Sequence, residues 1–117
     1  MKRSILREKS YAFSLRILKL HDFIIRESRA FALANQIVRS GTSIGANIME
    51  ASQAESKSDF VHKLAISNKE AFETEYWLSL LRDSGKITAS QAASMIKDCK
   101  ELQKLLTTSI KTAKLRK

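Results

Sequence analysis

The sequence predicts an all-α protein, an up-down-up-down four-helix bundle that forms one domain over residues 1–117. Two observations predict this fold. The chain has no proline and only 3 glycines in 117 residues, whereas about 5% of an average chain is proline, a residue that interrupts helices. Its apolar residues also recur at helical spacing in four segments, each about 20 to 28 residues long. Short connections between long helices favour antiparallel neighbours.

The first two segments each carry one apolar stripe. In the first segment the steps of seven, four, three and four residues place the stripe on a single helix face; it consists of Leu6, Phe13, Ile17, Leu20 and Ile24. The second segment begins near Ser28 or Arg29, and its apolar positions are Phe31, Ala34, Ile37, Val38, Ile44 and Ile48.

The last two segments have recognisable ends. Ser56 or Ser58 can cap the third segment, and Gly85 gives it a C-terminal stop. Its core stripe is Phe60, Leu64, Ser67, Ala71, Thr74, Leu78 and Leu81. The fourth segment begins at Thr88, and Gln91 three residues later completes a capping box. Its core stripe is Ala92, Met95, Ile96, Cys99, Leu102, Leu106, Ile110 and Ala113.

The stretch 40–47 is the weakest for a helix, because two glycines and three hydroxyl residues cost a few kcal/mol of helix propensity against alanine, by an estimate of about 1 kcal/mol per glycine. Gly41 and Gly45 lie four residues apart, so both can face one neighbouring helix and allow close approach. The alternative is a break in which Thr42 or Ser43 caps a new short helix. In that case Asn47 and Glu50 would satisfy the break by hydrogen bonding.

The third segment has more apolar surface than a bundle core requires. Beyond the stripe, Phe72 and Tyr76 lie on one flank and Trp77 on the other. A helix that is apolar around much of its circumference is usually buried on more than one side, so we predict an oligomer interface there. The alternative is that Tyr76 and Trp77 are amphipathic residues at the edge of the core.

The net charge of +9 is concentrated at the two ends of the chain. Residues 1–29 and 97–117 each have a net charge of +5, whereas residues 30–96 have −1. In the predicted bundle these two helices are adjacent and the termini meet at one end, which favours a phosphate-binding patch. The alternative is a solvated terminus whose charge only aids solubility. The predicted nucleic-acid-binding residues are Lys2, Arg3, Arg7, Lys9, Lys111, Lys114, Arg116 and Lys117.

The sequence offers little support for an enzyme. Di-metal bundles use two E-x-x-H pairs, and here Asp59 and His62 form the only comparable pair. Cys99 lies on a core stripe, where a thiol is usually a small apolar filler, and it has no partner for a disulfide. We therefore expect no cofactor, no metal site and a reducing, cytoplasmic environment. The apolar runs are far shorter than the roughly 18 residues that span a bilayer, so we expect no membrane segment.

Two runs resemble a known family. The run from Ser43 to Ala51, SIGANIMEA, resembles the pattern S-I-x-x-N-I-x-E, and the run from Glu70 to Leu78, EAFETEYWL, resembles E-x-x-E-T-x-Y-W-L. These patterns are similar to those of bacterial four-helix-bundle proteins encoded in intervening sequences of 23S ribosomal RNA genes. The accessory variability protein of diversity-generating retroelements is a related bundle. The family commonly has glycine where this chain has Ala51.

The resemblance implies a ring-like homopentamer with an RNA or other nucleic-acid role and no catalytic residues. It assigns Asn47, Glu50, Glu70 and Glu73 to motif positions, which we interpret as residues of fold and subunit packing. The leading hypothesis is therefore a non-enzymatic, oligomeric bundle that binds RNA or another nucleic acid through its basic first and fourth helices. The alternative is a protein-interaction scaffold that uses the apolar flank of the third helix and has no nucleic-acid role.

Overall fold

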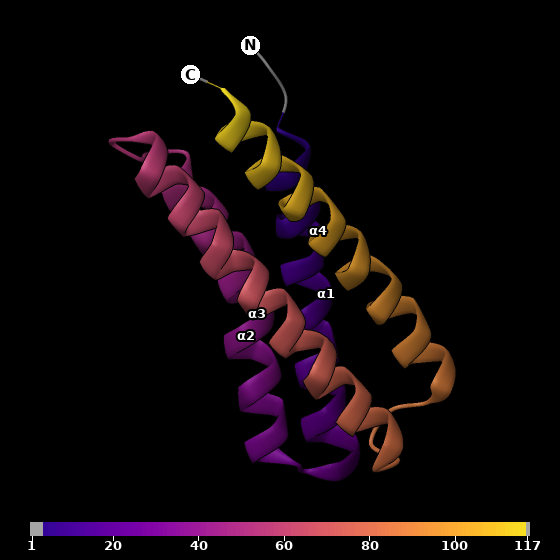
Figure 1. Cartoon of the computed structure of the whole chain (residues 1–117). Coiled ribbons are helices and arrows are strands. Elements are labelled where there is room, and N and C mark those ends of the chain that lie inside the picture. Colours follow the sequence, from indigo (N-terminus) through magenta and orange to yellow (C-terminus); the bar gives the residue numbers. More distant parts are fainter. Residues whose placement is uncertain (1–3, 117) are drawn as a thin grey trace.

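The computed structural model describes residues 4–116 and shows four helices in an antiparallel bundle (Figure 1). The molecule measures 50 × 24 × 20 Å, and each helix contacts its two neighbours around the bundle. This arrangement confirms the predicted up-down-up-down topology. The helices are α1 (Ile5–Ser28), α2 (Phe31–Ala51), α3 (Lys57–Asp83) and α4 (Ala89–Leu115).

Local hydrogen bonds fix three of the four helix starts. The hydroxyl of Ser56 accepts the amide of Asp59 at 3.0 Å and so caps α3, as predicted. The Thr88 hydroxyl accepts the Gln91 amide at 3.0 Å, and the Gln91 side chain accepts the Thr88 amide at 2.8 Å. The predicted capping box is therefore confirmed. Ser4 caps α1 in the same way by accepting the amide of Arg7 at 3.2 Å.

The start of α2 differs from the prediction. Arg29 adopts the left-handed conformation, with a φ of 56°, and its amide closes α1 on the carbonyls of Ile24 and Ile25. The second helix therefore begins at Phe31 rather than at Ser28 or Arg29. Phe31 is half-exposed, with the Arg29 guanidinium 5.7 Å from its ring centroid, because this first residue of the helix lies at the end of the bundle.

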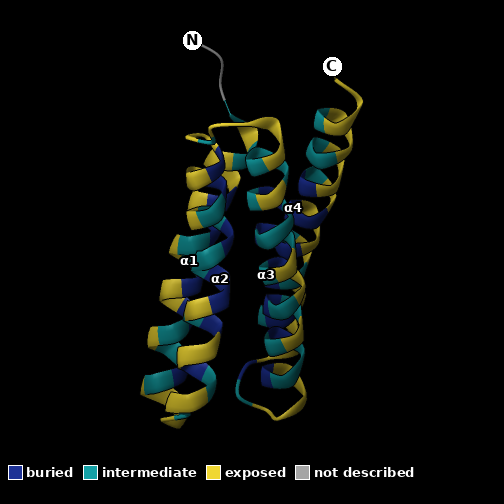
Figure 2. Cartoon of the chain, turned by 60° about the vertical axis from the view of Figure 1, so that its left-hand side comes forward, coloured by how far each residue is buried: buried dark blue, intermediate teal, exposed yellow. Residues whose placement is uncertain are grey.

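The apolar stripes of the four helices meet in one core (Figure 2). Ile96 and Ile110 on α4 are only partly buried and pack against its edge. Small polar side chains in the core bond to nearby groups. The hydroxyl of Ser67 donates to the carbonyl of Ile44 at 2.8 Å, and the hydroxyl of Thr74 lies 3.0 Å from that of Ser40. These contacts join α2 to α3.

The second helix runs through the stretch 40–47 without a break, so the predicted alternative of a new short helix is wrong. Gly41 is buried against α1, and a Cβ atom built there would lie 2.7 Å from Cγ1 of Ile17. The lack of a side chain at Gly41 is what allows this close approach. The cost in helix propensity is offset by tertiary packing, which often overrides propensity.

The seam between α1 and α4 is smaller than the other three and carries two ion pairs. Lys9 pairs with Glu101 at 3.3 Å, and Arg16 pairs with Asp98. Arg16 also donates to the hydroxyl of Ser94 at 2.8 Å. Within residues 4–116, no helix is long and apolar enough to cross a membrane.

Candidate nucleic-acid interface

The start of α1, the end of α4 and the connection between α2 and α3 lie at the same end of the bundle (Figure 1). Arg7 on α1 and Lys111, Lys114 and Arg116 at the end of α4 are all exposed there. Among the described residues, no carboxylate pairs with any of these four side chains. We call these four residues the basic end. The other predicted residues Lys2, Arg3 and Lys117 lie outside the described part of the chain.

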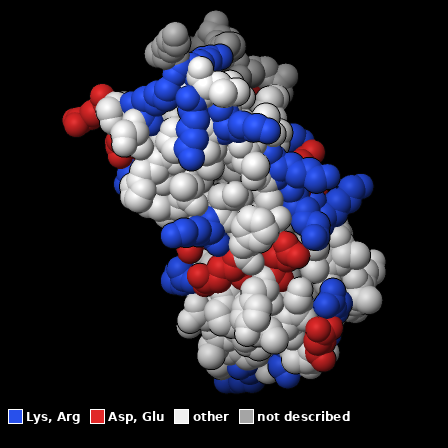
Figure 3. Space-filling view, viewed as in Figure 1, with Lys and Arg blue, Asp and Glu red and all other residues white. Residues whose placement is uncertain are grey.

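Lys9 differs from the four residues of the basic end, because its ammonium pairs with Glu101 of α4 at 3.3 Å. Nearly half of the side chain remains accessible, but its charge is partly neutralised. Figure 3 shows Lys and Arg side chains at the end of the molecule near the termini and along one side, with a band of Asp and Glu across the middle. Some Asp and Glu side chains also lie at the corner of this end where α2 leads into α3, but Lys and Arg predominate around the end of α4 (Figure 3).

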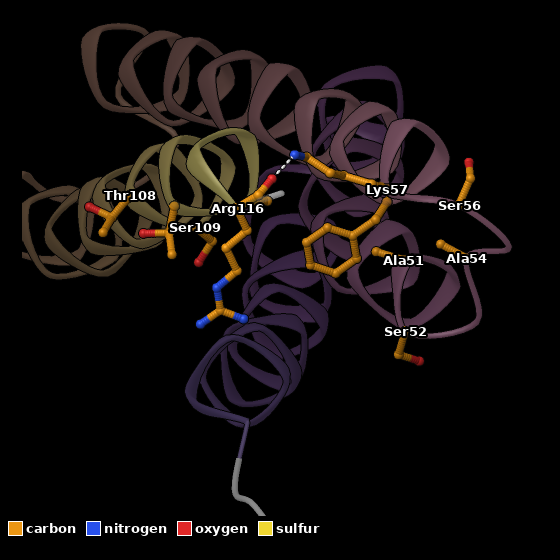
Figure 4. A pocket seen from close by; sticks show the side chains of 11 residues that line it. Ala51, Ser52, Ala54, Ser56, Lys57, Thr108, Ser109 and Arg116 are labelled. Atoms are coloured by element: carbon orange, nitrogen blue, oxygen red, sulfur yellow. Dashed lines mark hydrogen bonds between the residues drawn. The ribbon is translucent and has the colours of Figure 1, made fainter.

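The structure adds one cation that sequence analysis did not assign to this site. The Nζ atom of Lys57, the first residue of α3, donates to the main-chain carbonyl of Arg116 (Figure 4). The bond ties the start of α3 to the end of α4. The topology could have predicted the position of Lys57, because the connection between α2 and α3 in such a bundle lies at the same end as the termini.

The motif residues Glu70 and Glu73 hold α3 to α2 through Arg39. The guanidinium of Arg39 donates to Glu70 at 3.1 Å and also to Glu73. Glu73 accepts the indole N–H of Trp77 at 2.9 Å. The bond from Trp77, aided by Arg39, keeps the pKa of Glu73 below its ordinary value, and the Glu73 bond keeps the pKa of Arg39 above its own.

The remaining motif residues also make contacts within the chain. Glu50 accepts from Lys63 of α3 at 2.9 Å, which raises the pKa of the lysine. Asn47 donates from its side-chain amide to the carbonyl of Ser43 at 2.8 Å, one turn earlier in the same helix. Neither residue caps a break, because α2 is continuous. Ala51 ends α2 and Ser52 follows with a right-handed φ of −66°, so this turn does not need a glycine.

The third helix exposes Phe72 and Tyr76 by 57% and 58%. They line a shallow groove of about 380 Å³ between α3 and α4, together with Lys100 and Gln103. Trp77 is partly buried against the core, and its indole is bonded to Glu73. For Trp77 the structure therefore agrees with the alternative prediction, an amphipathic residue at the edge of the core. Of the three aromatic residues predicted at the interface, Phe72 and Tyr76 are therefore exposed, whereas Trp77 is not.

The first helix also has an exposed apolar stripe that was not predicted from the sequence. Tyr11, Leu15 and Leu18 on α1 are 69%, 47% and 45% exposed. Their spacing of four and three residues places them on one helix face, and that spacing was the available signal. The stripe was missed because it lies opposite the stronger pattern of Phe13, Ile17 and Leu20.

Cys99 is fully buried and its thiol donates to the carbonyl of Ala71 at 3.1 Å. Burial, reinforced by the negative charge of Glu75, raises the pKa of the thiol to about 12. A thiol that stays protonated at neutral pH is a poor nucleophile. Within residues 4–116, no group of three or more His, Cys, Asp or Glu side chains is placed to hold a metal ion.

These features define a small antiparallel four-helix bundle with a polar α2–α3 seam and a basic end. The chain belongs to the 23S rRNA-intervening sequence protein family, whose pattern it matches over residues 2–108. It is also similar to the crystal structure of a protein of unknown function from the S23 ribosomal protein family of Bacteroides thetaiotaomicron. The two are 50% identical with a TM-score of 0.90, over 92% of this chain and 99% of the other. No curated protein sequence matches the chain.

Proposed function

We propose that this protein is a non-enzymatic, oligomeric bundle that binds RNA by placing its basic end against phosphate groups. The observation that carries the proposal is the exposed set of Arg7, Lys111, Lys114 and Arg116, which has no carboxylate partner among the described residues. Family membership supports it, because the family is named for a segment of ribosomal RNA genes. We place this role in the cytoplasm, since a chain with one cysteine fits a reducing compartment.

The chemistry of such an interface is electrostatic. Each cation that meets a phosphate releases condensed counterions, so affinity falls as salt rises. None of the four side chains of the basic end is an amide of the kind that reads adenine edges, and contacts to phosphate position a protein without specifying sequence. We therefore propose recognition of backbone and shape, with little base preference at these four residues.

The test measures affinity for a structured RNA over a range of salt concentrations. We expect the variant with Lys111, Lys114 and Arg116 changed to Glu to bind more weakly. Its salt slope should fall by about 2 to 3, since each phosphate contact contributes about 0.7 to 0.9 to that slope. A matched control changes three lysines elsewhere to Glu and should bind almost normally; these are Lys19, Lys86 and Lys97. Binding that ignores salt, or equal losses in both variants, contradicts the proposal.

Self-association is the second part of the proposal. Phe72 and Tyr76 expose apolar rings beside a shallow groove, and such rings are enriched at interfaces. The family resemblance suggests five subunits. We expect light scattering to give a homo-oligomer for the native chain and smaller species for Phe72→Glu and Tyr76→Glu. Lys69→Gln, which makes the net charge more negative by the same amount elsewhere on α3, should leave the mass unchanged.

The second candidate function is a scaffold for another protein, favoured by the same exposed rings. It predicts a monomer whose α3 flank binds a different chain, and it predicts no salt-dependent RNA binding. Light scattering and the salt titration together separate the two. A homo-oligomer that binds RNA supports the first proposal, and a monomer without RNA affinity supports the scaffold.

A further inference from the structure

A pocket of about 590 Å³ opens at the basic end, between the last turns of α4 and the corner where α2 leads into α3 (Figure 4). Its α4 wall carries hydroxyls of Thr108, Ser109 and Thr112, and its opposite wall carries two serines. Pockets for small organic ligands have volumes of about 300–1,000 Å³, so this one is large enough for a substantial chemical group.

The polar lining of the pocket favours an anion. Lys57 and Arg116 both line it, and none of the described residues that line it is acidic. The ammonium of Lys57 uses one of its three N–H groups on the Arg116 carbonyl, which leaves two available. The guanidinium of Arg116 pairs with no carboxylate among residues 4–116. Ser52 donates its hydroxyl to the Met49 carbonyl at 2.6 Å, and Ser56 caps α3. The three hydroxyls of α4 and the two cations remain, and these groups suit the oxygens of a phosphate and a sugar.

The apolar part of the lining favours a flat ring. Phe60 lines the pocket and packs against the edge of the core, which holds the side chain in place. Three alanines complete this part of the wall. An unstacked base binds well to such an aromatic surface, whereas the bases of a duplex are stacked on one another and do not reach it.

We propose that the pocket binds one unpaired nucleotide of an RNA, with the phosphate held by Lys57 and Arg116 and the base stacked on Phe60. The inference rests on the proposed RNA-binding function and adds the kind of RNA that the basic end selects. The exposed cations of the basic end contact flanking phosphates, and the pocket distinguishes unpaired from paired nucleotides. A phosphate alone would leave the aromatic wall and most of the volume unused.

The experiment compares two RNA hairpins with the same number of nucleotides. One has a loop of unpaired nucleotides and a bulge, and the other is a fully paired stem closed by a flexible non-nucleotide linker in place of the loop. Fluorescence anisotropy at fixed salt gives the affinity for each. We expect the native chain to prefer the hairpin with unpaired nucleotides by at least about 10-fold. Removing the stacking of one base on an aromatic ring lowers the affinity by about 5- to 150-fold. We expect a loss of this size for Phe60→Leu, and only for the hairpin with unpaired nucleotides.

The matched control is Phe31→Leu, the same change at a half-exposed ring at the other end of the bundle, and it should leave both affinities unchanged. Ser109→Trp provides a second variant that fills the pocket from α4 without altering the core, in case Phe60→Leu does not fold. It should remove the preference for unpaired nucleotides. Circular dichroism verifies that each variant is helical.

Several results overturn the inference while the proposed function survives. Equal, salt-dependent affinity for both hairpins means RNA binding without a nucleotide pocket. If Phe60→Leu and Ser109→Trp both still prefer the hairpin with unpaired nucleotides, another part of the surface recognises those nucleotides. Competition by inorganic phosphate as strong as that by adenosine monophosphate means an anion site without base stacking. Absence of binding to either hairpin contradicts both proposals.

Discussion

Replacing Gly41 by alanine tests the close approach of α2 to α1. A Cβ atom at this position would lie 2.7, 2.8 and 3.0 Å from three carbons of Ile17. Ile17 is fully buried, and its β-branched side chain has few alternative rotamers. Forcing an extra carbon into a packed core costs about 1–3 kcal/mol. Alanine gains about 1 kcal/mol over glycine in helix propensity, so the net loss is about 0 to 2 kcal/mol.

Gly45 provides the matched comparison in the same helix. A Cβ atom there would lie 3.4 Å from the Ser10 hydroxyl, which is ordinary van der Waals contact. Gly45→Ala should therefore gain up to about 1 kcal/mol of stability. The propensity gain is common to both variants, so their difference of about 1–3 kcal/mol is the packing cost at Gly41 alone.

The assay is urea unfolding followed by far-UV circular dichroism at one protein concentration. A double variant strengthens the test, because Ile17→Ala removes the carbons that an alanine at Gly41 would strike. In that background Gly41→Ala should become neutral or stabilising by up to about 1 kcal/mol. The reasoning is refuted if Gly41→Ala proves at least as stable as Gly45→Ala.

Three further predictions concern single groups. Thr88→Ala should lower the free energy of unfolding by about 1 kcal/mol, measured by urea, because it removes the α4 cap. Thr108→Ala, at an exposed position inside the same helix, is its control. Cys99 should resist thiol reagents at pH 8 in the native chain, and equal rates in native and unfolded protein would contradict its burial. Folding raises the pKa of this thiol from 9.0 to about 12, so its stabilising contribution is complete below pH 9 and is lost as pH rises toward 12. The Cys99→Ala variant should therefore lose less free energy of unfolding at alkaline pH than the native chain does. Glu73 should protonate below its ordinary range and change Trp77 fluorescence as its bond to the indole is lost; an acid transition that persists in Glu73→Gln would refute this assignment.

The features that the sequence predicts correctly depend on local chemistry. The capping box at Thr88 and the cap at Ser56 require only residues three positions apart. The apolar stripes need only the helical repeat, which is enough to assign Phe13 and Leu78 to the core, where both are buried. The same local rules leave the stretch 40–47 undecided, because the deciding contact of Gly41 is with a residue of another helix.

The candidate site is less predictable for the same reason. The meeting of the termini follows from the topology, and Arg7 and Lys111 do lie at one end of the bundle. The pairing of Lys9 with Glu101 depends on the register of α1 against α4, which no local pattern specifies. The sequence around Ser56 and Lys57 indicates only a helix start, although the bond from Lys57 to α4 makes that start part of the same end of the molecule.

The small seam between α1 and α4 has a consequence for how the chain folds. The three larger seams join helices that follow one another directly, so most contacts form between residues near in sequence. Chains with such low contact order fold in microseconds to milliseconds. We expect three successive hairpins to form first, and the ion pairs of Lys9 and Arg16 to close the ring of helices last. Weakening that seam should then accelerate unfolding while leaving the folding rate almost unchanged.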